Sequence, residues 1–360
     1  MLSAATWTYS LVEYPQGLGR IAEGIARRIA RPVSHFGGDA LPTVAAIAHN
    51  PLVRRLIKAA RRIPADLYIA HYLAALPAAT RAASGNHAKL GFDAEDFHSG
   101  DLLDTPENRS ELRMRQTIER AFLCGCDYIT AASPFIAETY AARYGIRAES
   151  VLNVFPLSQA SYSSVQLTPN RRTVGTSVYW FSQTISAGRG LETALEALKY
   201  TSPNVHLYLR GTPASGFAEV LLSLARRYGV EHRLHFLERA PSDDMVQLAS
   251  QHDIGLSTEP REPLNRDICL TNKLFTYLLA GVPQIMTCTR AQRAIASDLG
   301  DAAQIVEPND PAGIGRAIDH WASAPERLKQ AKVAATKLGR ERYNWDVEKE
   351  KLLEIVRRVI

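Results

Sequence analysis

The residue types best suited to chemistry gather in and around the stretch Thr271–Pro283, which reads TNKLFTYLLAGVP. Thr271 and Asn272 are residues that favour the start of a helix, and Gly281 suits its end because glycine readily adopts a left-handed conformation. The unpaired N–H groups and the positive dipole at such a helix start favour an anion, especially a phosphate. Lys273 adds a positive charge in the first turn. The stretch therefore predicts a phosphate-binding helix start, with an ordinary helix of an α/β domain as the alternative.

Further polar residues that suit a phosphorylated ligand precede this helix. Arg189 stands between two glycines, and a guanidinium can bind a diphosphate through two parallel hydrogen bonds. Glu259 and Glu262 lie in the loop 259–269, where carboxylates can accept hydrogen bonds from ribose or sugar hydroxyls. Asn265 and its polar neighbours lie in the same loop. We predict that these residues bind a nucleotide or a sugar, and the alternative is that they are solvated loop residues.

An acidic turn in the first half of the chain is the second candidate for chemistry. Asp93, Glu95 and Asp96 are followed closely by His98. We predict a catalytic role for Asp93, with the other three residues as rival candidates, and a solvated acidic turn as the plain alternative. His71, which ends the sequence DLYIAH, is expected to pack rather than react.

Strands and helices are expected to alternate along the chain, which predicts an α/β protein with two parallel-sheet domains. The expected strands cover residues 4–10, 32–36, 66–71, 88–92, 128–132, 150–155, 176–181, 205–210, 234–237, 254–257, 284–287 and 304–306. The expected helices cover residues 20–29, 51–63, 73–83, 109–124, 191–199, 217–228, 242–250, 311–322 and 346–359, with others beginning near 133, 271 and 292. Ligands of such sheets bind at the carboxyl ends of the strands. The residues expected there are Asp93, His98, Gly211, Glu259 and Thr271.

The expected domains are residues 1–160 and 173–342, separated by a linker at 161–172 that is rich in serine, threonine, proline and asparagine. Three glycines near the expected strand ends and loops can let the backbone approach a ligand closely, although a glycine in a loop needs no ligand. These glycines are Gly17, Gly19 and Gly211.

The amino-acid composition and the net charge limit the classes of protein to which this chain can belong. The 360 residues carry a formal net charge of +5 and 46% hydrophobic residues, which suits a globular chain with large cores. The four cysteines are scattered, so we expect reduced thiols. No signal peptide and no apolar run that could span a bilayer are apparent, so we expect a cytoplasmic protein. The basic helix 51–63 is a candidate for peripheral contact with an anionic membrane, with a solvated basic face as the alternative, and no motif indicates nucleic-acid binding.

The second half of the chain resembles the retaining GT-B glycosyltransferases of glycosyltransferase family 4. The resemblance rests on SQTISAGRGLE at 182–192, LYLRG at 207–211, NKLFTYLLAGVP at 272–283 and YNW at 343–345. It extends over roughly residues 174–360 and is looser in the first half. It implies two Rossmann-like domains facing a cleft, with an acceptor-side domain first and a nucleotide-sugar-binding domain second. It also implies that the final helix, residues 343–360, crosses back onto the first domain.

The chain departs from the family at the positions where two glutamates eight residues apart are usual. Those positions hold Ile268 and Thr276, so the usual ribose-binding carboxylate is missing. Glu259 or Glu262 can substitute from the preceding loop. We keep Thr276 among the expected donor-binding residues because of its position.

Other family positions are also changed. The phosphate-binding pair of basic residues corresponds to Gln183 and Arg189, so one of the two cations has become an amide. The acceptor-side residue that is commonly a histidine corresponds to Asp93. These changes indicate a divergent branch or a protein that has lost activity.

The resemblance implies transfer of a sugar from a nucleoside diphosphate sugar to a hydroxyl of a glycan, a polysaccharide or a lipid-linked acceptor, with retention. Arg189, Lys273 and the helix start would stabilise the leaving diphosphate, so we expect neither a metal nor a resident cofactor. Two alternatives stay open. One is an inactive nucleotide-binding or scaffold protein, and the other is a nucleotide-sugar epimerase of the same fold.

Overall fold

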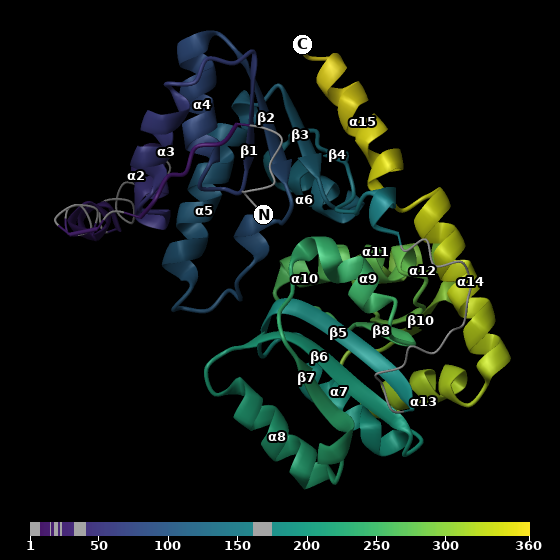
Figure 1. Cartoon of the computed structure of the whole chain (residues 1–360). Coiled ribbons are helices and arrows are strands. Elements are labelled where there is room, and N and C mark those ends of the chain that lie inside the picture. Colours follow the sequence, from purple (N-terminus) through teal and green to yellow (C-terminus); the bar gives the residue numbers. More distant parts are fainter. Residues whose placement is uncertain (1–7, 15, 18–20, 22–23, 32–40, 161–174) are drawn as a thin grey trace. The chain divides into compact units, whose positions relative to one another are not determined.

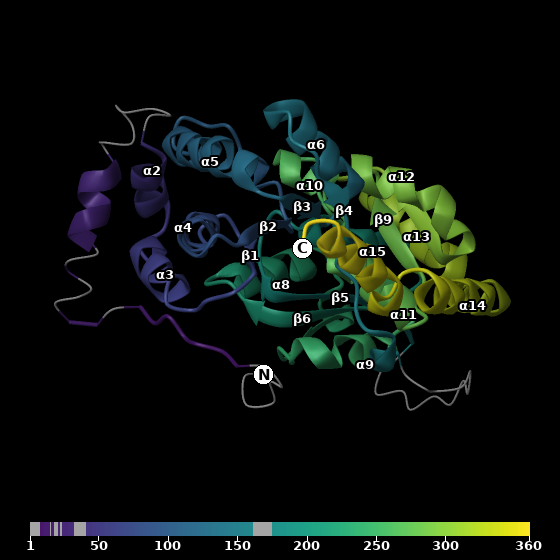
Figure 2. The ribbon, with the colours of Figure 1, turned by 90° about the horizontal axis from the view of Figure 1, so that it is seen from above.

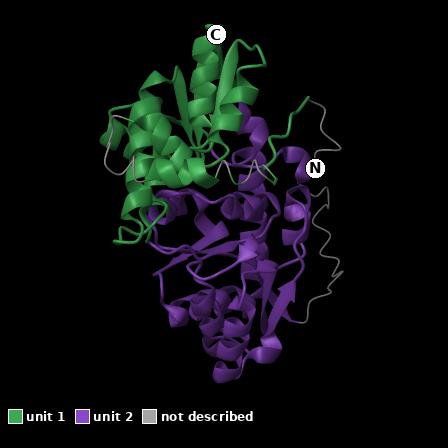
Figure 3. Ribbon diagram, turned by 90° about the vertical axis from the view of Figure 1, so that its left-hand side faces the viewer, with its two compact units in different colours: residues 1–151, 262–265, 351–360 green, residues 152–261, 266–350 purple. Residues whose placement is uncertain are grey.

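The computed structural model describes residues 8–14, 16–17, 21, 24–31, 41–160 and 175–360 (Figure 1). Gly19, the strand expected at 32–36, most of the strand expected at 4–10 and the linker at 161–172 lie outside these described residues. The chain divides into two compact units (Figure 3). Unit 1 comprises Met1–Val151, Glu262–Asn265 and Lys351–Ile360, and unit 2 comprises Leu152–Arg261 and Arg266–Glu350. The domain boundaries expected from the sequence stay a prediction.

The described residues of unit 1 form a four-stranded sheet in the order β1-β2-β3-β4, with every neighbouring pair parallel. The strands are β1 (Leu67–His71), β2 (Lys89–Ala94), β3 (Tyr128–Ala131) and β4 (Glu149–Ser150). The fully described helices are α2 (Pro42–His49), α3 (Val53–Ala60), α4 (Leu76–Asn86), α5 (Arg109–Phe122) and α6 (Pro134–Tyr144). Residues 24–31 are helical as well.

Local sequence explains several of these boundaries. Ser133 accepts a hydrogen bond from Phe135 N at 3.1 Å, and Pro134 occupies the first helical position, which confirms the predicted start of α6. Three expectations are wrong. Helix α2 is absent from the expected helices, β4 is a two-residue strand instead of the run 150–155, and Asp93 lies within β2 rather than after it.

Unit 2 contains a six-stranded parallel sheet in the order β10-β9-β8-β5-β6-β7. The strands are β5 (Thr176–Ile185), β6 (Val205–Pro213), β7 (Leu234–Leu237), β8 (Ile254–Ser257), β9 (Gln284–Thr287) and β10 (Ala303–Val306). The helices are α7 (Leu191–Ala197), α8 (Phe217–Tyr228), α9 (Met245–Ala249), α11 (Asn272–Leu279), α12 (Arg290–Leu299), α13 (Pro311–Ala322) and α14 (Pro325–Glu341). Two more helices, α10 (Leu264–Ile268) and α15 (Trp345–Arg357), have residues in both units.

The predictions are better for unit 2. Strands β7, β8 and β9 and helices α8 and α13 have the predicted bounds. Strands β5 and β6 extend beyond the predicted ends, and the 17-residue helix α14 is absent from the expected helices. Different helices cover the two faces of this sheet (Figure 1). Residues of α7, α8 and α13 belong to one hydrophobic core, and residues of α9 and α11 belong to another.

Among the described residues, no helix combines the length and the apolar character needed to cross a membrane.

Buried histidines make the stability of this fold dependent on pH. His252 is 4% exposed and stacks on Tyr179 with ring centroids 4.2 Å apart. Burial lowers the pKa of His252 from 6.5 to about 4. Because the unfolded chain binds more protons between those two pH values, the free energy of unfolding rises with pH across this window. We expect His252 to contribute about 3 kcal/mol at pH 7, all of which is lost as the pH falls to 4.

Urea denaturation at a series of pH values measures this effect. His252→Gln is expected to remove the part of this pH dependence of stability that is due to His252. The part due to His98 in unit 1 remains, because burial also lowers the pKa of His98 to about 4. The exposed His232 supplies a matched control, His232→Gln. A slope that is the same in the wild type and in His252→Gln contradicts the assignment.

Candidate functional site

The order of strands in unit 2 identifies where a ligand is expected. The chain runs from β5 outward to β6 and β7 and then returns to the other side of β5 to form β8, β9 and β10. This reversal between β5 and β8 is a topological switch point, and ligands of open α/β sheets bind outside the carboxyl ends of the strands there. Arg189 follows β5, and Glu259 follows β8. Two residues predicted from the sequence therefore lie in the two loops that border the switch point.

The loops after β5 and β8 pack directly against each other. Thr258 Oγ1 donates a hydrogen bond to the carbonyl oxygen of Arg189 at 3.1 Å. Gly190 has a φ of +70°, and a Cβ there would lie 2.5 Å from the carbonyl oxygen of Thr258. Only glycine fits this contact, so the Gly188–Gly190 segment is shaped to bring Arg189 next to the β8 loop.

Glu259 is the centre of a buried charge network. Its side chain is 1% exposed, and Lys273 Nζ lies 2.9 Å from Oε1 while Arg266 Nη1 lies 3.4 Å from Oε2. Burial alone would raise the pKa of Glu259, but the charges of Lys273, Arg266 and Arg189 lower it. The network therefore keeps Glu259 ionised and brings three of the predicted site residues together, namely Arg189, Glu259 and Lys273.

Lys273 lies in the first turn of helix α11, and its side chain pairs with Glu259. Its side chain is 5% exposed, and Nζ lies 5.5 Å from the centre of the Trp180 ring. Thr271 occupies the capping position with an extended backbone, as predicted, but its side chain makes no capping bond. The hydroxyl Oγ1 of Thr271 is buried without a hydrogen-bond partner among the described residues. The start of α11 thus offers an unpaired hydroxyl and the N–H groups of a first helical turn beside a buried ammonium group.

Three other residues predicted for the donor site lie in unit 2, and two of them, Gly211 and Thr276, have contacts there that need no ligand. Gln183 lies exposed within β5, at an irregularity in its pairing with β6. Gly211 lies inside β6 with a φ of +145°, where a Cβ would meet the carbonyl oxygen of Ser182 at 2.3 Å. Thr276 is fully buried, and its hydroxyl donates to Asn272 O at 2.9 Å. Their participation in ligand binding stays a prediction.

Three further predicted residues are exposed. Asn272 begins α11, and Glu262 lies in the loop before α10. Gly17 has a φ of +56°, and no described atom lies within 4 Å of the position that a Cβ would take there. No close contact at Gly17 among the described residues therefore requires glycine.

Asn265 is held within unit 1 by three hydrogen bonds. Its Nδ2 donates to Asp96 Oδ1 at 2.7 Å and to Asp101 Oδ1 at 2.9 Å, and its Oδ1 accepts from Phe97 N at 2.8 Å. The residue is 1% exposed. A buried amide with this full set of partners fixes the loop between β2 and α5, and it would have to break these bonds to bind a sugar.

We expect Asn265→Ala to lower the free energy of unfolding by about 1–3 kcal/mol, because it leaves the buried N–H group of Phe97 without its acceptor and removes one hydrogen bond from each of two carboxylates. Urea denaturation measures the change. Asn272→Ala, at an exposed asparagine, is the matched control and should change stability by less than about 0.5 kcal/mol. Equal effects of the two variants would contradict the structural role of Asn265.

Asp93 and His71 form a pair at the carboxyl ends of adjacent strands in unit 1. His71 Nδ1 lies 3.0 Å from Asp93 Oδ2, and Thr130 Oγ1 donates to Asp93 Oδ1 at 2.7 Å. The hydrogen bond that His71 donates to Asp93 is the largest cause of the raised pKa of His71. The side chain of His71 is 57% exposed, so the expectation that it packs in the core is wrong. The sequence signal was its position as the last residue of an expected strand, and the register of β1 on β2 places it directly opposite Asp93.

The rival candidates near Asp93 lie in different surroundings. Glu95 Oε1 is 3.9 Å from His71 Nδ1, and burial followed by the charge of Asp93 raises the pKa of Glu95. Among the described residues, His71, Asp93 and Glu95 bring three possible metal ligands within 4.8 Å of one another, a geometry that exposed acidic groups often have without a metal. His98 is buried, and Asp96 holds Asn265.

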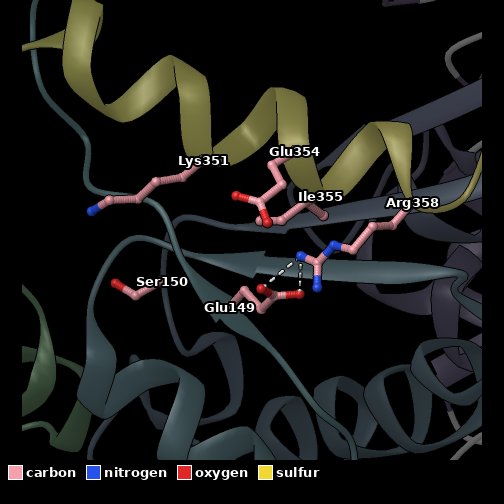
Figure 4. A pocket seen from close by; sticks show the side chains of 6 residues that line it. All are labelled: Glu149, Ser150, Lys351, Glu354, Ile355 and Arg358. Atoms are coloured by element: carbon pink, nitrogen blue, oxygen red, sulfur yellow. Dashed lines mark hydrogen bonds and ion pairs between the residues drawn. The ribbon is translucent and has the colours of Figure 1, made fainter.

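One pocket in unit 1 has no relation to the predicted residues (Figure 4). It lies between β4 and the last turns of α15 and is lined by Glu149, Ser150, Lys351, Glu354, Ile355 and Arg358. Arg358 Nη2 lies 2.7 Å and 2.8 Å from the two carboxylate oxygens of Glu149. Because this ion pair satisfies both groups, the pocket presents no unpaired charge from either of them.

Comparisons with known proteins place the fold. No family model matches the chain, and no curated protein matches it. Among solved structures, HepE from Anabaena in complex with UDP and glucose matches with a TM-score of 0.70 and 19% identity, covering 86% of this chain and 82% of that chain. Sucrose-phosphate synthase from Thermosynechococcus elongatus matches with a TM-score of 0.70 and 13% identity, covering 89% and 79%.

A third structure carries the same fold in a protein named as a phosphatase. The N-terminal domain of trehalose-6-phosphate phosphatase from Candida albicans matches with a TM-score of 0.64 and 14% identity, covering 88% of this chain and 75% of that chain. At these identities the similarity establishes the architecture and not the activity. The chain has the GT-B fold, with two Rossmann-like parallel-sheet domains, as its resemblance to glycosyltransferases implied.

Proposed function

We propose that this protein is a glycosyltransferase that moves a sugar from a nucleoside diphosphate sugar to a hydroxyl acceptor. The observation that carries the proposal is the group formed by Arg189, Glu259 and Lys273 at the switch point of unit 2. Cations beside a helix start suit a diphosphate, and the ion pairs that Glu259 makes hold two cations at this place. HepE, which has the same fold, is described with UDP-glucose, so a UDP-sugar is the first donor to test.

The proposed reaction breaks the bond between the anomeric carbon and the diphosphate oxygen and forms a bond from that carbon to the acceptor oxygen. Negative charge develops on the departing diphosphate, and Arg189, Lys273 and the N–H groups at the start of α11 stabilise it. The departing phosphate takes the acceptor proton on the same face of the sugar, which retains the anomeric configuration. Glu259 holds the Lys273 ammonium group in position. These groups can stabilise the leaving group without a metal ion.

On the acceptor side we assign Asp93 the role of orienting the acceptor hydroxyl together with His71. The acceptor in this proposal is a glycan, a polysaccharide or a lipid-linked sugar. Thr130 and His71 each occupy one oxygen of the Asp93 carboxylate, so the exposed imidazole of His71 is the part of the pair that can reach an acceptor.

Asp93→Asn tests this pair. We expect a lower pKa for His71, because the largest cause of its elevation is removed, and a turnover lowered by about tenfold to a hundredfold. An NMR titration of His71 measures the first effect, and a transfer assay measures the second. Asp104→Asn, in the loop before α5, is the matched control. Unchanged turnover together with a shifted His71 pKa would contradict the acceptor-side role of the pair, but not the pairing of His71 with Asp93.

Two alternative functions have specific observations in their favour. Thr276 and Ile268 replace the usual glutamates and are fully buried, which favours a nucleotide-binding protein without activity. The His71–Asp93 pair supplies the carboxylate and the histidine that an epimerase needs, which favours nucleotide-sugar epimerisation. Incubation with a donor and no acceptor separates them, since an epimerase converts the sugar, and a binding protein leaves it unchanged.

A thermal-shift screen with UDP, GDP, ADP, CMP and their common sugars, without metal, tests the proposed function first. A ligand at about 100 times its Kd adds about 2.7 kcal/mol to stability and raises the melting temperature visibly. One clear hit identifies the base of the donor and justifies a transfer assay with that sugar. No hit in a folded sample would contradict the transferase proposal and favour the inactive scaffold.

A further inference from the structure

The basic helix α3 buries the apolar face that the sequence offered for a membrane. Val53 is fully buried, and Leu56 and Ile57 are half-buried, while α3 packs against α4. The basic side chains of this region stay exposed, and they are Arg54, Arg55, Lys58, Arg61 and Arg62. Helix α3 therefore exposes its basic side chains and buries much of its apolar face. Apolar contacts with a membrane would have to come from another segment.

The helical residues 24–31, together with Ile21, present an uncovered apolar stripe. Ile21, Ile25 and Ile29 are each helical and are spaced four residues apart, a spacing that suits one face of a helix. Their exposures are 59%, 51% and 61%. Isolated exposed apolar residues are common, whereas three that share one face form a patch of the kind that marks an interaction site.

The opposite face of this helix is the one that packs on the protein. Ala30 is 6% exposed, and Arg27 Nε donates a hydrogen bond to the carbonyl oxygen of Ala48 at the end of α2. Figures 1 and 2 show residues 24–31 beside α2 and α3 at the edge of unit 1. The isoleucine stripe consequently faces away from the rest of the unit.

The sequence around the stripe is predominantly basic, with Glu23 as the one acidic residue in the stretch 21–31. Residues 24–31 contain three arginines and no acidic residue, and the stretch 40–65 contains four arginines, one lysine and no acidic residue. A surface with an apolar stripe bordered by cations matches the interface of an anionic lipid bilayer, where apolar side chains enter the acyl boundary and cations meet the headgroups.

We propose that unit 1 docks on an anionic membrane surface through the stripe formed by Ile21, Ile25 and Ile29, with the basic side of α3 as an electrostatic support. The docking does not depend on the proposed transferase activity, because none of these residues belongs to the predicted donor or acceptor site. It does give a physical reason for a lipid-linked acceptor, since unit 1 also carries the His71–Asp93 pair.

Co-sedimentation of the full chain with vesicles tests the proposal. We expect binding to vesicles that contain phosphatidylglycerol, little binding to phosphatidylcholine alone, and weaker binding at high salt. Ile21→Ser/Ile25→Ser/Ile29→Ser should lower the partition coefficient by about tenfold or more. Val220→Ser/Ile305→Ser/Val333→Ser removes three exposed apolar side chains from unit 2 and should leave binding unchanged.

Three results would overturn the proposal. They are no binding of the wild type to anionic vesicles, equal binding by the isoleucine variant, and a dimer of the wild type that the isoleucine variant abolishes in analytical ultracentrifugation. The last result would assign the stripe to a second copy of the chain. Circular dichroism and the nucleotide thermal shift confirm that the isoleucine variant is folded, and an active variant that no longer binds vesicles separates docking from the transferase proposal.

Discussion

Glu259→Ala is expected to lower the free energy of unfolding of unit 2 by about 3–5 kcal/mol, because it leaves a buried cation without its counter-charge. Lys273 Nζ lies 2.9 Å from Glu259 Oε1, and their side chains are 5% and 1% exposed. Removal of the carboxylate alone therefore leaves an ammonium group that water reaches poorly. Urea denaturation followed by circular dichroism measures the change at neutral pH.

A double-mutant cycle separates the pair from the cavity that alanine creates. Glu259→Gln keeps the shape of the side chain and removes its charge, and Lys273→Met removes the cation. We expect the double variant to be more stable than the sum of the two single changes predicts, since neither charge then stays buried alone. Additive effects, or a loss below about 1 kcal/mol for Glu259→Ala, would show that water screens the pair.

Arg189→Ala is expected to lower turnover by about a hundredfold or more, on the scale of losing one donor to the transition state. The carbonyl oxygen of Arg189 is fixed by Thr258, and its charge contributes to the lowered pKa of Glu259. Its guanidinium therefore lies in the same electrostatic environment as the carboxylate and the Lys273 ammonium group. Since the stabilised charge develops on the leaving diphosphate, kcat should fall more than the affinity for the free nucleotide.

Single-turnover kinetics with the donor found by the thermal-shift screen measure this effect, and the thermal shift with the free nucleotide measures the affinity. Arg226→Ala removes an arginine whose side chain is 70% exposed on α8 and serves as the matched control. Turnover of Arg189→Ala within about threefold of the wild type would remove Arg189 from the proposed mechanism.

Lys273→Ala alone is a poorer test of the same mechanism. It removes a proposed phosphate ligand, but it also leaves the buried Glu259 carboxylate, whose side chain is 1% exposed, without Lys273. Lost activity in that variant would combine a direct effect and a structural one. For this reason the activity prediction rests on Arg189, and the stability prediction rests on Glu259.

Elements with strong local signals could be located from the amino-acid sequence. The apolar run of β8 is bounded by polar residues, and the helix start at Ser133-Pro134 satisfies the backbone with its own side chain. Residue types alone predict the start of α11 and its glycine at position 281, which has a φ of +69°. These features depend on residues a few positions apart, so local physics suffices to recognise them.

Which of the polar residues meet depends on the folded chain. Arg189 and Glu259 are 70 positions apart, and only the order of the strands, with β5 next to β8, brings their loops together. The sequence suggests that Asn265 binds a sugar, but its side-chain amide forms hydrogen bonds with residues more than 160 positions away in the chain. The sequence suggests that His71 packs, and the register of β1 on β2 instead places it exposed beside Asp93. Residue types indicate what chemistry a side chain can do, whereas pairing and burial, which depend on distant parts of the chain, determine which partners it has.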